Sequence, residues 1–364
     1  MSATVILPAV TSLLAALFSV ALLDQWRERH RAYQLIWAIG MLFFAIGSAC
    51  EALAGAGGWN EPLYRTWYLT GAVWTAGWLG LGTAFLLART RFGYTFAVCL
   101  GLAGIFTLLT QRTHNYPAAG AAPALYLLAA LVLAVAISVE TYFQNEHWPR
   151  IAALGVIGAT VVSVALMATT ALPAPGYALD PRTSIPTGDL FPGTIRLLTP
   201  FLNITGGLAL TLGALFSAYV FMPKRRVLGY SLDPGQSGDV FLFNLLIAPV
   251  AIVVNFVASL PGTVRALVGG RLHSRVPATI LIAVGALVAS STDSLNRFGS
   301  TALFQTGKLA AVVLLFAGFL VSIEVFREVR IPFTTIRLLA TRREHGRAGD
   351  LPVAAADDGQ NGGA

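Results

Sequence analysis

Apolar runs about as long as a lipid bilayer is thick recur throughout this chain of 364 residues. Only 11% of the residues are charged, whereas a soluble domain carries about 25%. Inside hydrocarbon a backbone satisfies its hydrogen bonds as a helix, and about 20 apolar residues span the layer. A large soluble core would not repeat such runs almost free of charge. The sequence therefore predicts an all-α, polytopic transmembrane helical bundle.

Nine runs are expected to form spanning helices. They cover residues 3–23, 34–55, 67–88, 92–110, 121–142, 151–172, 195–221, 276–291 and 302–325. The transmembrane domain is expected to include residues 1–346. Residues 347–364, which are rich in Ala, Gly and Asp, are predicted to form a disordered cytoplasmic tail.

Basic residues between the runs predict the orientation of the helices. If the N-terminus lies outside, the cytoplasmic segments hold seventeen Lys and Arg residues and the outer loops hold five. Cytoplasmic loops carry the excess of Lys and Arg, so we expect an outer N-terminus and a cytoplasmic C-terminus. The net charge of +7 then reflects topology, and no nucleic-acid partner is predicted.

The apolar segment 240–269 does not fit a simple alternation of crossings. It lies between two basic stretches that both read as cytoplasmic, so it should cross an even number of times. Thirty residues are too few for two full crossings. We expect a re-entrant hairpin bent at Pro249 and Pro261, or helices lying along the inner interface. A single crossing that overrides the charge rule is the alternative.

Near the C-terminus, residues 333–343 mix apolar side chains with Arg337, Arg342 and Arg343. This pattern predicts a short amphipathic helix on the anionic cytoplasmic leaflet. Membrane lipids are thus the expected partners, and a protein partner or a homo-oligomer is the other candidate association.

Lys308 is the ionisable residue placed deepest in a predicted spanning helix, three residues after Gln305. A buried ammonium is costly and indicates a counter-ion, a proton carrier or a ligand contact. The alternative is that its flexible stem carries the charge to the outer interface. Glu51, near the outer end of its own run, reads either as part of an ion-pair cluster or as an ordinary interfacial charge.

The run 195–221 contains Pro200, Asn203, Gly206 and Gly207. Proline frees a carbonyl and glycine permits unwinding, so a broken helix could expose backbone groups and the Asn203 amide to a ligand. Close helix packing is the competing interpretation. Small residues continue at four-residue spacing, which favours packing; they are Ala209, Gly213 and Ser217.

Trp74 and Trp78 lie deep in the run 67–88 and share one helical face with Trp67. Two indoles at this depth could wall a pocket for a lipid or an aromatic ligand. Filling space beside the glycines of the same run is the simpler account.

Catalytic and cofactor motifs are missing from the sequence. It has no Walker loop, HExxH or GxSxG motif, and its five histidines fall in expected loops or the tail. Its two cysteines, Cys50 and Cys99, fall near opposite sides of the membrane and are not expected to pair. We therefore predict no catalytic residues, no metal site and no cofactor.

Two stretches carry a resemblance to known proteins. Tyr33–Gly40 running on to Glu51, followed by Tyr64–Gly82, resembles the seven-helix membrane-sensor regions of bacterial histidine kinases. Arg196–Asn203, Leu295–Gly299 and Leu315–Leu320 are similar to uncharacterised bacterial multi-pass membrane proteins. The resemblance implies a bacterial cytoplasmic (inner) membrane protein. Unlike the sensors, this sequence carries no kinase or cyclase output domain.

Three functions follow as hypotheses. The first is a non-enzymatic membrane protein that senses or binds a ligand or supports a complex. The second is a secondary transporter or channel that uses the 195–221 run and Lys308. The third is an intramembrane lipid-modifying enzyme, for which the sequence offers no nucleophile.

Overall fold

The computed structural model describes residues 3–143, 146–181, 184–231, 235, 237–270, 272–273, 275–296, 301–321, 328–330 and 337–340. The chain divides into two compact units, Met1–Phe326 and Arg327–Ala364. Within the described residues, ten helices are long and apolar enough to cross a membrane. The chain is an integral membrane protein with an all-α bundle, as the composition predicts.

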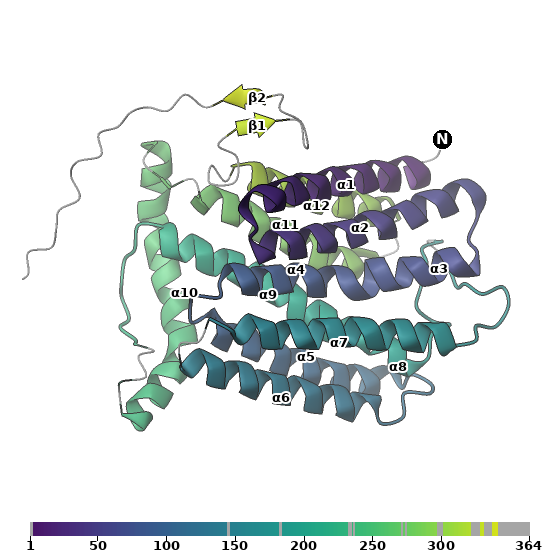
Figure 1. The fold of residues 1–364 in the computed structure, drawn as a ribbon, viewed down its shortest axis with the longest axis horizontal. Helices are drawn as coiled ribbons and strands as arrows, with labels where there is room; N and C mark the ends of the chain where they lie inside the picture. Colours follow the sequence, from purple (N-terminus) through teal and green to yellow (C-terminus); the bar gives the residue numbers. More distant parts are fainter. Residues whose placement is uncertain are drawn as a thin grey trace, which may run out of the picture. The chain divides into compact units, whose positions relative to one another are not determined.

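Apart from α10 (Gly238–Val268), the long helices of the first unit lie side by side along one common direction (Figure 1). The bounds of the helices are α1 Ala3–Arg29, α2 Ala32–Gly57, α3 Glu61–Trp67, α4 Thr75–Leu86, α5 Phe92–His114, α6 Ala122–Tyr142, α7 Trp148–Thr169, α8 Gly193–Arg196, α9 Leu198–Phe221, α10 Gly238–Val268, α11 Arg275–Asn296 and α12 Thr301–Val321. Glycine ends some of these helices, as Gly57 and Gly58 do between α2 and α3.

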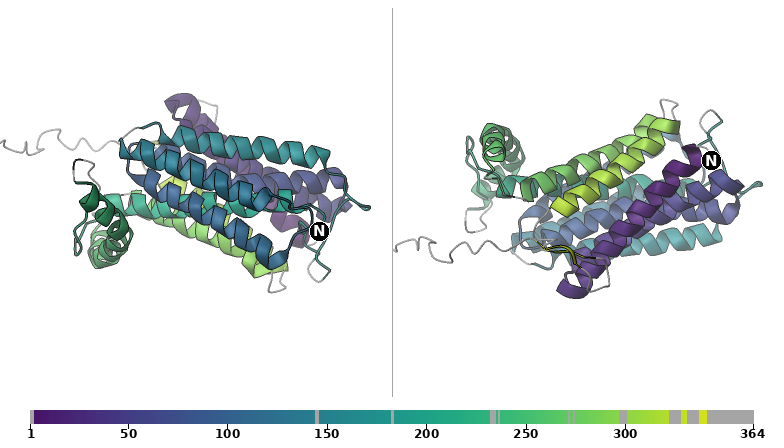
Figure 2. Two further views of the ribbon diagram at one scale, coloured as in Figure 1. Left: turned by 90° about the horizontal axis from the view of Figure 1, so that it is seen from below. Right: turned by 90° about the horizontal axis from the view of Figure 1, so that it is seen from above.

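Helix α10 differs from the rest in direction. The other long helices share one axis, whereas α10 runs across one end of the bundle, which Figures 1 and 2 show from three sides. It continues as a helix through both Pro249 and Pro261, so the predicted re-entrant hairpin is wrong. A helix lying across the ends of the others fits the interfacial alternative. By length and composition the same helix could also cross a membrane once, so the single crossing stays an alternative.

A π-helix, η1 (Tyr68–Trp74), interrupts the span that begins with α3 and ends with α4. The wider turn removes backbone carbonyls from the usual hydrogen-bond ladder, and side chains bind two of them. The Asn203 amide donates to the Ala72 carbonyl at 3.0 Å, and the Thr75 hydroxyl donates to the Thr70 carbonyl at 2.7 Å. The irregular backbone of this protein therefore lies in the third span, where hydropathy gives no sign of it.

Helix α9 continues without interruption through Pro200, Gly206 and Gly207, so the structure does not contain the predicted break. Pro200 lies in the first turn, where its missing N–H is not needed. Gly206 faces α4 so closely that a Cβ there would overlap the Ala76 carbonyl. This contact agrees with the packing interpretation at Gly206, where α9 and α4 touch through their backbones.

The loop between α7 and α8 covers one end of the bundle. Phe191 is buried and stacks on Tyr64 and Tyr68, with ring centroids 5.0 and 4.3 Å apart. Arg65 donates to the carbonyls of Met167 and Thr170 where the loop begins. We call residues 173–192 the outer cap, after the orientation that the basic residues predict; Tyr64, Tyr68 and Arg65 hold it on the bundle.

The second unit contains two short antiparallel strands, β1 (Glu328–Arg330) and β2 (Arg337–Ala340). The amphipathic helix predicted over 333–343 is therefore wrong at residues 337–340. Pro332 and the β-branched residues Thr334, Thr335 and Ile336 explain this, because all four disfavour helix. Residues 333–336 and 341–343, which include Arg342 and Arg343, lie outside the described residues, as does the tail 347–364.

Candidate functional site

A buried ion pair joins the second and last helices. The Lys308 Nζ lies 2.8 Å from both carboxylate oxygens of Glu51. The Glu51 side chain is 4% exposed and that of Lys308 is 16% exposed. Isolated charges at this burial are very costly, and the pairing offsets that cost. We take this pair as the centre of the candidate site.

The two helices place the charges at the same depth. Glu51 lies about two turns before the C-terminal end of α2, and Lys308 lies about two turns after the start of α12. These two ends lie on the same side of the bundle as the outer cap. The Lys308 ammonium also lies 5.3 Å from the ring centre of Phe304 and 5.8 Å from that of Phe44. The aromatic faces add favourable charge–quadrupole contact to the pair.

Two neutral donors complete the surroundings of the Glu51 carboxylate. Gln305 Nε2 donates to one oxygen at 2.9 Å, and Trp67 Nε1 donates to the other at 2.8 Å. The Glu51 carboxylate thus accepts from two helices besides its own. Each donor offsets part of the cost of burying the carboxylate, because the hydrogen bonds are charge-assisted.

Trp67 also links the ion pair to the outer cap. Its indole stacks on Tyr64 with ring centroids 5.9 Å apart, and Tyr64 stacks on Phe191 of the cap. A rearrangement of the cap would therefore reach the Glu51 carboxylate through three touching aromatic rings. Only two side chains, those of Tyr64 and Trp67, separate Phe191 of the cap from the Glu51 carboxylate.

Within one turn of the ion pair on its own helices, two polar atoms of the described residues have no hydrogen-bond partner. They are Oε1 of Gln305 and Oγ of Ser48, and both residues are buried. Ser48 precedes Glu51 by one turn, so both occupy one face of α2. Buried polar atoms are normally paired, so each marks a place where a polar molecule would gain a hydrogen bond. The amide oxygen only accepts, and it therefore calls for an N–H or O–H donor.

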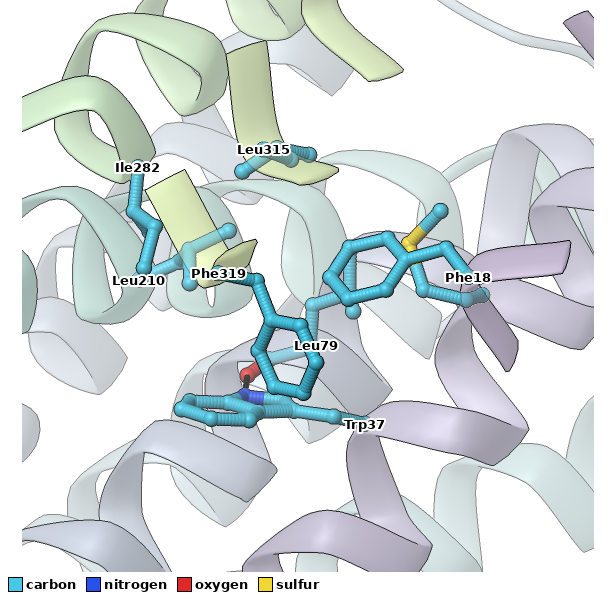
Figure 3. Close-up of a pocket in the computed structure, with 8 residues that line it drawn as sticks. Phe18, Trp37, Leu79, Leu210, Ile282, Leu315 and Phe319 are labelled. Atoms are coloured by element: carbon cyan, nitrogen blue, oxygen red, sulfur yellow. Dashed lines mark hydrogen bonds between the residues drawn. The ribbon is translucent and has the colours of Figure 1, made fainter. Parts of the chain in front are cut away.

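Toward the other end of α2 and α12, the helices enclose a small apolar cavity of about 30 Å³ (Figure 3). Its wall comes from six helices, and the Trp37 indole N–H in that wall donates to the Leu79 carbonyl at 2.9 Å. An apolar cavity this small stays dry, because its lining offers a water no hydrogen-bond partners. Phe18, Leu315 and Phe319 thus form an apolar block between the ion pair and the far end of the bundle.

The remaining predicted ligand residues make packing contacts elsewhere. Trp74 donates to Ser163 at 2.8 Å and Trp78 donates to Thr160 at 3.2 Å, which ties their span to α7. Phe43 packs on both indoles. Asn203 bonds the π-helix, as described above. The structure brings Gln305 and Lys308 together, and it places Trp74, Trp78 and Asn203 in helix-to-helix contacts.

Sequence analysis missed the partners of Lys308. The sequence predicts Glu51 as an ion-pair or interfacial charge at the outer end of its run, and it gives Trp67 only as a residue on the face of Trp74 and Trp78. A usable signal was present, because an intramembrane cation pairs with an anion at equal depth and Glu51 is the acidic residue inside the run 34–55. The outer charges instead form separate pairs, Arg65 with Glu61 at 2.6 Å and Arg196 with Asp189 at 3.0 Å.

Among the described residues, no group of three or more His, Cys, Asp or Glu side chains lies close enough together to hold a metal ion. Cys50 and Cys99 are both buried and free, as their depths predict. The side chains at the candidate site offer charge pairing, proton exchange and hydrogen bonding. The chain matches no family model, no curated protein and no solved structure.

Proposed function

We propose that this protein is a non-enzymatic membrane sensor that binds a small polar ligand beside the Glu51–Lys308 pair. The observation that carries the proposal is the buried, fully hydrogen-bonded carboxylate whose neighbour Gln305 keeps an unpaired amide oxygen. A buried ion pair contributes little net stability compared with apolar packing, so a role in binding gives a reason for placing charges in a membrane.

The proposed ligand is identified by the groups that would bind it. The Gln305 and Ser48 oxygens accept hydrogen bonds, and the Lys308 ammonium attracts an anionic group. A compact molecule with an N–H or O–H donor and a carboxylate or phosphate would satisfy these groups. The ligand would enter from the side of the outer cap, because Lys308 is partly exposed and the apolar block closes the opposite direction.

Sensing is favoured over an open channel for the same reason. An ion path needs polar groups along its length, whereas the described side chains beyond the ion pair line a dry apolar cavity. Aromatic contacts join Trp67 to Tyr64 and Tyr64 to Phe191 of the outer cap. A change that a ligand induces at Glu51 would therefore reach the cap through these rings. The resemblance to histidine-kinase sensor regions supports the same proposal, with the output supplied by a separate partner protein.

Native mass spectrometry of protein gently extracted from its own membrane tests this proposal. We expect a small molecule bound to the natural protein and to the control Thr306→Ala, which alters an exposed neighbour of Gln305. The double variant Glu51→Gln with Lys308→Met, which removes both charges together, should lose it. A natural protein without any bound molecule, or equal retention in all three proteins, would refute the ligand site.

Proton-coupled transport is the second candidate, and the charge pair inside a span is the observation that favours it. The test is proteoliposomes loaded with a pH-sensitive dye and given a pH step. Transport predicts a dye response that Glu51→Gln abolishes and Thr306→Ala leaves intact. Equal responses from both variants would eliminate this role for the pair.

A further inference from the structure

Helix α10 carries a long apolar stripe that other described side chains leave uncovered. Its members recur three, four or seven residues apart and are between 56% and 78% exposed; they are Leu242, Leu246, Val250, Val253, Val257 and Val264. This spacing places them on one face of the helix. A contiguous exposed patch of this length marks a surface that contacts a membrane or another protein.

The opposite face of α10 is polar, and it is occupied. Asn255 Oδ1 accepts from the backbone N–H groups of Val227 and Leu228 at 2.7 and 2.9 Å, and its amide donates to the Leu228 carbonyl. Ser259 accepts from the N–H of Arg225 at 2.8 Å. These bonds hold the segment 223–230 along α10, so the apolar stripe is the face left for an external partner.

Aromatic contacts fix α10 at the ends of the spanning helices. Phe241 packs on Tyr142 at the end of α6 and on Tyr94 near the start of α5, with ring centroids 5.3 and 6.1 Å apart. Phe256 lies 6.5 Å from Tyr219 near the end of α9. A helix crossing the bundle at this level (Figures 1 and 2) lies where acyl chains give way to headgroups.

Exposed cations lie beside the same helix. The triplet Lys224, Arg225 and Arg226 is held to α10 by the bonds of Ser259 and Asn255, and Arg265 follows Val264 of the stripe. An amphipathic helix with a basic border attracts anionic lipid headgroups. Charge and shape both favour a lipid leaflet over a protein partner.

We propose that α10 lies in the plane of the membrane with its apolar stripe inserted in one leaflet, and that the triplet Lys224–Arg226 recruits anionic phospholipid there. The proposal does not depend on the ligand site at Glu51. It assigns this end of the molecule a lipid-binding surface, so the local concentration of anionic lipid would regulate how firmly α10 is seated.

Depth-dependent quenching in lipid nanodiscs tests the inserted stripe. Val257→Cys and the control Val227→Cys have side chains of equal exposure, 56% each, on the stripe and on the segment 223–230. With an environment-sensitive fluorophore on each, nitroxide lipid should quench the probe at position 257 and aqueous iodide the probe at 227. Equal iodide quenching would overturn the proposal. Shielding of position 257 from both quenchers would also overturn it, because a protein would then cover the stripe.

Lipid retention tests the cations. The triple variant Lys224→Gln, Arg225→Gln and Arg226→Gln should lower the preference for phosphatidylglycerol over phosphatidylcholine by about fivefold per cation removed. The control Arg112→Gln removes an exposed cation at the other end of the bundle and should change nothing. An unchanged preference in the triple variant, or the same fall in the control, would reject the recruitment of anionic lipid.

Discussion

At the scale of single residues, the Glu51–Lys308 pair is the feature whose substitution should reduce stability most. Either charge alone would remain buried without its counter-ion, since the two side chains are 4% and 16% exposed. The donors Gln305 and Trp67 would then orient toward a carboxylate that no cation balances. The pair therefore behaves as one unit, and single and double substitutions should differ sharply.

Glu51→Gln or Lys308→Met alone should lower the free energy of unfolding by about 3–5 kcal/mol. The double variant should recover most of that loss, because no unpaired charge remains in the membrane. Thermal unfolding in nanodiscs measures this as a double-mutant cycle, with Thr306→Ala as the neutral reference. Additive losses would mean that the two side chains do not interact.

The backbone contact of Gly206 gives a second residue-scale prediction. Gly206→Ala places a methyl group against the Ala76 carbonyl and should cost about 1–3 kcal/mol or more, because two helix backbones must move apart. Gly101→Ala meets nothing within 4 Å and should be neutral or slightly stabilising. The melting temperatures of the two variants, measured in the same lipid, test this difference. An equal fall in both would contradict close packing at Gly206.

At the scale of elements, the π-helix depends on a side chain from another span. Asn203→Ala removes the donor to the Ala72 carbonyl and should cost about 1–3 kcal/mol, the range for an unsatisfied buried polar group. Hydrogen exchange should rise locally over η1 (Tyr68–Trp74) and the start of α4. A uniform rise over the whole bundle would argue that Asn203 supports general packing instead.

The outer cap is a second element with a testable anchor. Phe191→Ala removes a buried ring from between Tyr64 and Tyr68 and should cost about 3–5 kcal/mol at that site. We expect faster proteolysis within 173–192 while the spanning helices stay resistant. Leu190→Ala, on a half-buried neighbour, is the matched control.

The sequence predicts an element well when the interactions that form it lie within one segment of the chain, and poorly when they join distant segments. Apolar runs predict the spans because each helix satisfies its own backbone. The run 276–291, for example, becomes part of α11. The π-helix and the partner of Lys308 depend on which helices become neighbours, and hydropathy does not encode that. The strand at 337–340 shows the converse, since a plausible helical charge pattern yields to β-branched residues and a proline.

At the scale of the whole molecule, the direction of α10 makes a prediction about sidedness. If α10 does not cross, residues 227 and 273 lie on one side and residue 113 lies on the other. With an impermeant maleimide on intact cells, Thr113→Cys should react, whereas Val227→Cys and His273→Cys should react only after the cells are opened. The natural cysteines are buried and should stay silent. Opposite behaviour of positions 227 and 273 would show that α10 spans the membrane.

The depth of the ion pair has an electrical consequence for the whole protein. The charges of Glu51 and Lys308 cancel, so a displacement of α2 and α12 together carries no net charge through the membrane potential. A displacement of α12 alone would instead carry the Lys308 charge, which lies about two turns inside the bundle, part of the way across that potential. A full unit charge moved across 100 mV is worth about 2.3 kcal/mol, and a charge part-way across feels a fraction of that. The pair thus makes the bundle insensitive to voltage as long as α2 and α12 move together.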